Sequence, residues 1–279
     1  MRLVIMGDLH YHDTDAAIAG WTEARDRFYE TMIERFLEEE GDFHISLGDL
    51  TNYGTATELE GVYGLLGRKS RTFVHALGNH DLYAQKRADV LAFTGQQRYH
   101  AIDTERATLV FLDTAKEQDF EDWGGWVDEE QLRWLEGVVQ ASGAKPMLVF
   151  AHHPVYRTTK RSEMDKGSIH HSIDMWSVLE QKQGIGVYFN GHTHVDSIHR
   201  ERNWTFVQLS AVLDQHAVRL VDVEPDCIRI AAKDVEEAGV VDAAPTLYAH
   251  MPHFRHNPEA RGEAEDRECI VSLTAATQA

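Results

Sequence analysis

The chain has 279 residues, of which 43% are hydrophobic, so it can bury a large core and one domain is the simplest organisation. Its 46 acidic and 27 basic residues give a net charge of −19, which opposes binding to extended DNA or RNA. A small anionic substrate stays possible where bound cations reverse the local field. Two cysteines provide neither a disulfide framework nor a thiolate metal site. With no signal-peptide pattern and no membrane-length apolar run, we expect a cytoplasmic protein.

The first part of the chain alternates predicted strands with predicted helices. Residues 3–6 form a continuously apolar run, typical of a strand buried on both faces. Residues 21–40 have apolar side chains at helical spacing and end at Gly41. A strand over 43–47, a helix over 55–67 and a strand over 72–77 follow. This order predicts βαβ units and a largely parallel central sheet.

A polar motif follows each of these three strands. Asp8 and His10 come after the first strand, Asp49 after the second, and Asn79, His80 and Asp81 after the third. The carboxyl ends of parallel strands meet at one edge of a sheet, where ligands bind. Each motif taken alone is equally compatible with ordinary turn chemistry, so their combination carries the argument.

The second part of the chain adds two further histidine motifs. Strands are predicted over 98–102, 108–112, 146–151 and 186–189, and helices from Asp128 and over 174–183. The strand over 146–151 ends in His152-His153-Pro154, and the strand over 186–189 leads to His192 and His194. Residues 155–173 form a basic loop, which either covers the mouth of an anion site or is simply solvated.

Four more strands, over 195–199, 204–209, 217–223 and 227–232, are expected to form a second sheet built of hairpins. The periodicity stops near Asp234. We therefore expect a catalytic domain over 1–235 and an extension over 236–279 that either wraps the domain or joins a dimer contact.

Taken together, seven oxygen or imidazole side chains follow five separate apolar strands. Such ligands without thiolates suit Mn, Fe, Co, Zn or Ni. Seven are too many for one ion with an open position, but they suit two ions if one carboxylate bridges them. The predicted metal ligands are Asp8, His10, Asp49, Asn79, His152, His192 and His194.

The ordered pattern Asp-x-His, Gly-Asp, Gly-Asn-His-Asp, His, Gly-His-x-His resembles that of the calcineurin-like metallophosphoesterases over residues 7–194. The resemblance implies an α/β fold of four layers, α-β-β-α, in which two packed mixed sheets are flanked by helices. It also implies a dinuclear centre of Mn, Fe, Zn or Co that activates a hydroxide to attack phosphorus in line.

The resemblance further implies a role for each motif residue. Asp8, His10 and His194 would hold one ion, Asn79, His152 and His192 the other, and Asp49 would bridge them. His153 is set aside, because the family's ligand stands two residues before the proline. His80 would protonate the leaving alkoxide or bind a phosphate oxygen. Asp81 would hold the tautomer of His80 or cap the following turn.

Departures from known subfamilies narrow the predicted substrate. Residues 48–54 read GDLTNYG, without the phosphate-binding arginine of protein Ser/Thr phosphatases, and Asn52 replaces the ligand tyrosine of purple acid phosphatases. The pattern is most similar to bacterial cyclic-nucleotide and glycerophosphodiester phosphodiesterases. We therefore expect hydrolysis of a small phosphodiester, with a phosphomonoesterase as the alternative and a non-catalytic metal-binding scaffold after it.

The expected partner is a small phosphoester, with no nucleic-acid polymer and no membrane, and a homo-oligomer is left open. Several remaining histidines have weaker assignments. His12, His170 and His171 either reach substrate or lie in surface loops, and His250, His253 and His256 are given no role.

Overall fold

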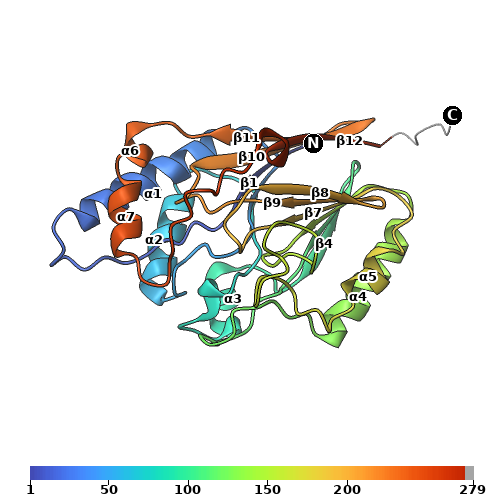
Figure 1. The fold of residues 1–279 in the computed structure, drawn as a ribbon, viewed down its shortest axis with the longest axis horizontal. Coiled ribbons are helices and arrows are strands. Elements are labelled where there is room, and N and C mark those ends of the chain that lie inside the picture. Colours follow the sequence, from blue (N-terminus) through green and yellow to red (C-terminus); the bar gives the residue numbers. More distant parts are fainter. Residues whose placement is uncertain (274–279) are drawn as a thin grey trace.

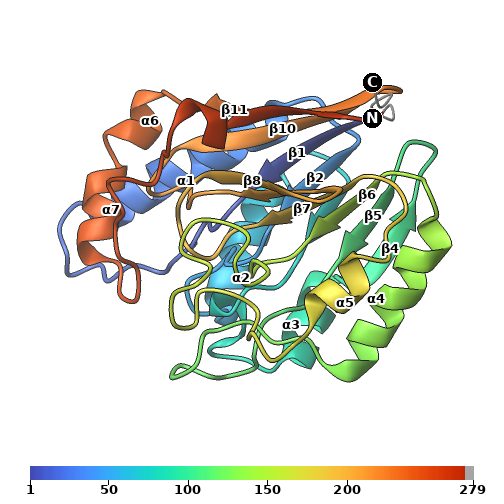
Figure 2. The same cartoon turned by 45° about the vertical axis from the view of Figure 1, so that its right-hand side comes forward.

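A computed structural model describes residues 1–273, in which two six-stranded mixed sheets pack face to face between helices (Figures 1 and 2). The four-layer α-β-β-α fold expected from the resemblance is confirmed. The first sheet has the order β12 (Glu268–Ser272), β11 (Cys227–Asp234), β10 (Ala217–Val223), β1 (Arg2–Met6), β2 (Phe43–Ser46), β3 (Phe73–His75). The second has the order β4 (His100–Asp103), β5 (Thr108–Phe111), β6 (Met147–Phe150), β7 (Gly186–Asn190), β9 (Trp204–Gln208), β8 (Ser197–Glu201).

The alternation of side chains along β1 divides the core into layers. Leu3 and Ile5 point into the apolar core between the two sheets. Val4 and Met6 point the other way, into the core beneath the helices. A strand buried on both faces must be apolar throughout, which explains why residues 3–6 show no polar alternation.

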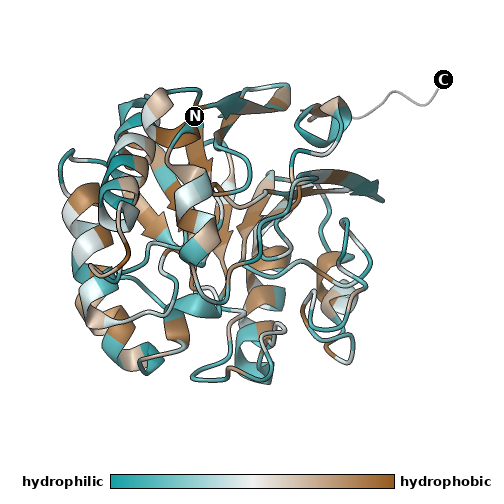
Figure 3. Ribbon diagram, turned by 60° about the vertical axis from the view of Figure 1, so that its left-hand side comes forward, coloured by the Kyte–Doolittle hydropathy of each residue, from teal (hydrophilic) through white to brown (hydrophobic). Residues whose placement is uncertain are grey.

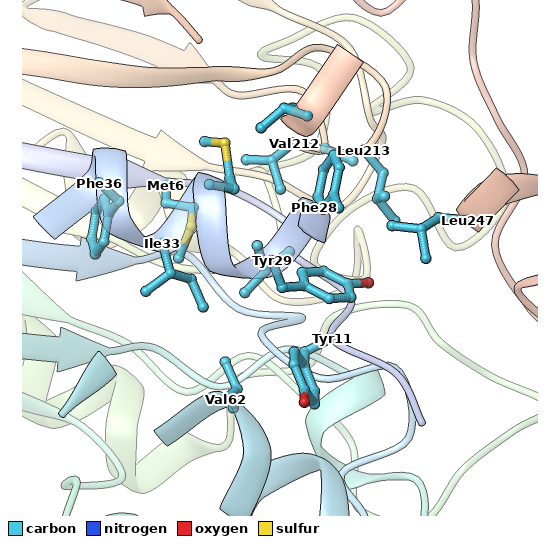
Figure 4. Close-up of a cluster of buried hydrophobic side chains, with 14 of the residues drawn as sticks. Met6, Tyr11, Phe28, Tyr29, Ile33, Phe36, Val62, Val212, Leu213 and Leu247 are labelled. Atoms are coloured by element: carbon cyan, nitrogen blue, oxygen red, sulfur yellow. The ribbon is translucent and has the colours of Figure 1, made fainter. Parts of the chain in front are cut away.

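Helices cover the outer face of each sheet. The first sheet is covered by α1 (Trp21–Glu38), α2 (Ala56–Leu66), α6 (Ala238–Val241) and α7 (Ala244–His250), and the second by α4 (Glu129–Ser142) and α5 (Met175–Leu179). Figure 4 shows Phe28, Ile33 and Phe36 of α1 in the core that this helix shares with Met6. In Figure 3 the central strands are mostly brown, which marks apolar residues, whereas the outer helices alternate brown and white with hydrophilic teal. These amphipathic faces hold the layers together.

The expected hairpin sheet is wrong. Strand β9 is buried along its whole length and pairs in parallel with β7, so it continues the second sheet, and only β8 forms a hairpin with it. Strands β10 and β11 do form a hairpin, but they extend the first sheet from the free edge of β1. The chain therefore has no single central sheet. Each sheet combines parallel strands with antiparallel ones.

Three helices are absent from the sequence-based prediction. Helix α3 (Arg87–Thr94) buries only Val90, so it has no apolar stripe for a periodicity argument to detect. Helices α6 and α7 are short and pack on α1, and β12 pairs antiparallel with β11. The last residues, 274–279, lie outside the described part of the chain, so the prediction for the extension concerns 236–273 here.

Candidate metal centre

The predicted ligands are brought together at the carboxyl ends of five strands. Asp8 and His10 follow β1, Asp49 follows β2, Asn79 follows β3, His152 follows β6, and His192 and His194 follow β7. These strands belong to both sheets, so the site lies at the end of the sandwich where the carboxyl ends of strands from the two sheets meet. Five of the seven side chains are almost fully buried, His192 is partly exposed, and the side chain of His194 is 17% exposed. The centre is therefore enclosed, with its opening near His192 and His194.

The side chains form two groups that share the carboxylates. The donor atoms of Asp8, His10 and His194 lie within 4.8 Å of one another, and so do those of Asp8, Asp49 and His152. Asp49 Oδ2 lies 3.1 Å from His152 Nε2 and 3.9 Å from His10 Nε2, so it lies between the groups. Asn79 donates through Nδ2 to Tyr83 Oη at 2.8 Å. Its Oδ1 is thereby left for the centre, 3.1 Å from His152 Nε2.

Each of the four ligand histidines is oriented through its second ring nitrogen. His152 Nδ1 donates to the carbonyl of Leu47 at 2.9 Å, and His192 Nε2 donates to the carbonyl of Lys166 at 2.8 Å. His10 Nδ1 lies 3.2 Å from Asn52 Oδ1, and His194 Nδ1 lies 3.5 Å from Asp214 Oδ2. The first three acceptors fix one hydrogen on their rings, so the other nitrogen of each neutral ring presents a lone pair, while Asp214 is the charged partner of His194.

Those free nitrogens face one another in two pairs. His10 Nε2 lies 3.2 Å from His194 Nε2, and His152 Nε2 lies 3.2 Å from His192 Nδ1. Two lone pairs at that distance repel, so each pair requires a shared proton or a cation. The arrangement therefore demands positive charge at two places, one on each side of Asp49.

The pKa values of the four rings follow the same pairing. Burial opposes protonation of His152, but Asp49 outweighs burial and raises the pKa of His152 to about 9. Burial likewise opposes protonation of His194, but Asp214 and Asp8 raise its pKa to about 10. Burial and the neighbouring His152 lower the pKa of His192 to about 3, and burial and His80 lower that of His10. In each facing pair, the ring beside a carboxylate therefore holds a proton more readily than its partner.

The backbone at the centre is held in unusual conformations. His10, Asp49, His192 and His194 have φ angles of 50°, 48°, 74° and 52°, in the left-handed region that non-glycine residues seldom adopt. Each such residue costs on the order of 1–3 kcal/mol and persists where the surroundings enforce it. Nearby glycines allow the close approach of ligands. A Cβ on Gly48 would lie 2.6 Å from His152 Nδ1, and one on Gly191 would clash with Asp8 Oδ2.

The expectation that Asp81 holds the tautomer of His80 is wrong. Asp81 accepts hydrogen bonds from the amide and hydroxyl of Thr51 and from the amide of Gly78, so it ties two loops together. His80 is oriented by Asn52 instead, because its Nδ1 donates to the Asn52 carbonyl at 2.8 Å. The physical reason is the helical turn His80–Leu82, in which adjacent side chains point in different directions.

Asn52 and Asp214 contact the candidate site histidines, and the motifs did not reveal either residue. Asn52 is fully buried and contacts both His10 and His80. Asp214 faces His194 from a segment that carries no metal motif. The only sequence signal at Asn52 was its place in GDLTNYG, and none pointed to Asp214.

The other candidate histidines have separate partners. Both ring nitrogens of His153 have protein partners, the Thr114 hydroxyl and the Trp123 carbonyl, although a ring nitrogen of His153 also lies within 4.8 Å of those of His152 and His192. His12 Nδ1 lies 2.7 Å from buried Glu58, and His170 contacts Ser172 on the surface.

The basic loop is hydrogen-bonded to its surroundings, although many of its side chains are exposed. Arg161 donates to the carbonyl of Thr193 and to Asn257, and Lys166 lies over the ring of Trp123 at 4.2 Å. The loop therefore packs beside the His192–His194 turn. Among the described residues, no helix is long and apolar enough to cross a membrane.

The chain is similar in sequence to one protein family and to two named proteins. Residues 1–196 match the family model of the calcineurin-like phosphoesterases. The chain is 24% identical to a glycerophosphodiester phosphodiesterase of Enterobacter lignolyticus, over 77% of this chain and 78% of that protein. It is 28% identical to a probable cyclic nucleotide phosphodiesterase of Rhodopseudomonas palustris, over 70% and 72% of the two chains.

Solved structures share the fold. A dimetal phosphatase of Danio rerio superposes with a TM-score of 0.72 at 15% identity, covering 98% of this chain and 99% of the other. GAP50, the anchor in the inner membrane complex of Plasmodium, has a TM-score of 0.60 at 11% identity and covers 86% of each chain. The chain belongs to the calcineurin-like phosphoesterase family and is a metal-dependent phosphoesterase.

Proposed function

We propose that this phosphoesterase hydrolyses a small phosphodiester at a centre of two divalent metal ions. The observation that carries the proposal is the two facing nitrogen pairs, His10 with His194 and His152 with His192, on either side of Asp49. A single ion cannot satisfy both pairs, whereas two ions can share Asp49. Asp8, His10 and His194 would hold one ion and Asn79, His152 and His192 the other.

Two bound divalent ions would supply an activated water nucleophile and positive charge for the phosphoryl oxygens. The protein holds the donors in place before any ion arrives, because the second nitrogen of each histidine is already anchored. Mn, Fe, Zn and Co all accept this mixture of carboxylate, amide and imidazole donors.

His80 would supply the proton for the leaving alkoxide. Its Nδ1 hydrogen is committed to the Asn52 carbonyl, so the transferred proton must stand on Nε2 and the ring must be an imidazolium. Burial lowers the pKa of His80, which disfavours that charge in the free protein. An anionic phosphodiester, and the charge that develops on the leaving oxygen, favour the charged ring once substrate is bound.

Support for a diester comes from the two relatives named above as phosphodiesterases, which match over most of their length. Arg161 and Lys166 keep their positive charges beside Asn257 and Trp123, which are neutral, so these two residues do not separate the diester from the monoester.

The test compares turnover of bis(4-nitrophenyl) phosphate and 4-nitrophenyl phosphate by metal-reconstituted protein at one pH. We expect the diester to be hydrolysed faster, and both activities to disappear in chelator. His152→Asn and His153→Asn make a matched pair, because the residues are adjacent and equally buried. Only His152→Asn should abolish turnover. A higher monoester rate would refute the diester preference, and a protein that binds two ions without turnover would favour a scaffold.

A further inference from the structure

The segment 251–257, here called the C-terminal strap, lies against the metal centre although it falls outside the residues that match the family model. It follows α7, the red-orange helix at the left of Figure 2. Met251, Phe254 and Asn257 are buried, while Pro252, His253 and Arg255 between them are exposed. The strap therefore presents one face to the protein.

On one side, the strap supports His10. The ring of Phe254 packs edge-on against the ring of His10, with centroids 5.2 Å apart. The carbonyl of Pro252 accepts a hydrogen bond from Asn52 Nδ2 at 3.0 Å. That bond fixes the Asn52 amide so that its Oδ1 faces His10 Nδ1. The strap thus decides which nitrogen of His10 is free for a metal.

On the other side, the strap supports His194. Phe254 contacts the His194 ring at 5.3 Å, and Asn257 Nδ2 donates to the His194 carbonyl at 2.7 Å. Asp214, which faces His194 Nδ1, accepts hydrogen bonds at 2.8 Å from His256 Nδ1 and from the amide of Asn257. Both carboxylate oxygens of Asp214 are therefore oriented, one by the strap and one toward His194.

The second group of ligands is supported differently. His152 donates to the carbonyl of Leu47, directly after β2, and His192 donates to the carbonyl of Lys166, in the basic loop over 155–173. Among the described contacts of these two rings, none involves the strap. The support of the two groups is thus asymmetric.

We propose that the C-terminal strap is a positioning element for one of the two metal ions, the one held by Asp8, His10 and His194. The inference rests on the two-ion centre proposed above. Loss of an outer partner of a ligand histidine typically weakens metal affinity about 10- to 100-fold. Because the strap acts on two ligands of one ion and on none of the other, its disruption should weaken one binding event and spare the second.

The experiment titrates Mn²⁺ into metal-free, full-length protein by calorimetry. Wild type should bind two ions. Phe254→Ala and Asn257→Ala should each weaken one event by about tenfold or more and change the other less than twofold. Phe254→Leu, which keeps the apolar cover, should restore most of the affinity. Phe93→Ala, at an exposed phenylalanine of α3, is the matched control and should change neither event.

Ligand variants assign the affected event. In a His192→Ala background, Phe254→Ala should weaken the remaining ion. In a His194→Ala background it should have no effect. Circular dichroism before each titration confirms that the variants are folded. If both events weaken equally, or neither does, while wild type binds two ions, the strap proposal fails alone. If wild type binds fewer than two ions, the proposed function fails and this inference with it.

Discussion

Replacement of Asn52 by alanine tests how the centre is held together. Asn52 is fully buried, accepts from His10 Nδ1 at 3.2 Å and donates to the Pro252 carbonyl at 3.0 Å. Asn52→Ala leaves the buried ring of His10 without its hydrogen bond, at about 1–3 kcal/mol, whereas water can reach the carbonyl of exposed Pro252. The metal-free protein should therefore lose about 1–3 kcal/mol of unfolding free energy. His10 would also lose its fixed tautomer, so Mn²⁺ affinity should fall about tenfold or more.

The assay is urea unfolding of metal-free protein, followed by Mn²⁺ titration. Asn203→Ala is the control, because Asn203 Nδ2 also makes two hydrogen bonds to carbonyls, of Lys182 and Gly184. Asn203 lies at the amino end of β7, whereas His192 and His194 follow its carboxyl end. It is half-buried, so water can replace the lost bonds and metal affinity should not change. The reasoning would be refuted if Asn52→Ala lost less than about 0.5 kcal/mol of unfolding free energy, which is half of the smallest expected penalty. Equal Mn²⁺ affinity in the two variants would also refute it.

Three further predictions concern catalysis, substrate recognition and pH. His80→Ala should slow hydrolysis of an alkyl diester about 10²–10⁴-fold. It should slow hydrolysis of bis(4-nitrophenyl) phosphate far less, because 4-nitrophenolate leaves without a proton. Equal losses of kcat for both substrates would contradict the role of His80 as an acid. Phe120 is 48% exposed and stacks on Tyr83, whose hydroxyl accepts a hydrogen bond from Asn79, with ring centroids 4.4 Å apart. If Phe120 stacks on an aromatic substrate ring, Phe120→Ala should raise KM for the aromatic diester about fivefold (about 1 kcal/mol of stacking). KM for glycerophosphodiesters, which have no aromatic ring, should stay unchanged. Burial lowers the pKa of Lys182 to about 8 from its ordinary value of 10.5. Between these two pH values the unfolded chain binds more protons than the folded protein, so Lys182 makes the unfolding free energy rise with pH. Urea unfolding at pH 8 and at pH 10 should therefore show a smaller rise in Lys182→Met than in wild type. The same rise in both proteins would disprove the lowered pKa of Lys182.

The clustering of the candidate ligands was predictable because its signals are local. Each ligand follows an apolar strand within a few residues, and parallel strands bring such ends together whatever the details of the loops. The core was predictable for a similar reason, since the apolar run over 3–6 directly reflects burial on both faces of β1. The division of β8–β11 between the two sheets was not predictable from the sequence. Which strands pair depends on which sheet edge is free, and the hydrophobic pattern of a strand does not reveal that.

The supports of the ligands lay beyond sequence reasoning. Asn52 and the Pro252 carbonyl are 200 residues apart, and Asp214 reaches His194 from a turn with no motif. Backbone carbonyls such as those of Leu47 and Lys166 leave no trace in residue identity at all. For Asp81, closeness in sequence was misleading. Asp81 follows His80 directly, but it accepts hydrogen bonds from the amides of Thr51 and Gly78.

The most direct test of the two-ion centre is a crystal structure of the Mn²⁺-loaded protein with anomalous data. The account predicts two anomalous peaks about 3.5–4 Å apart, a spacing typical of two-metal sites. One peak should lie between His10 Nε2 and His194 Nε2, the other between His152 Nε2 and His192 Nδ1, with Asp49 bound to both. A single peak, or a second ion away from Asp49, would contradict the account.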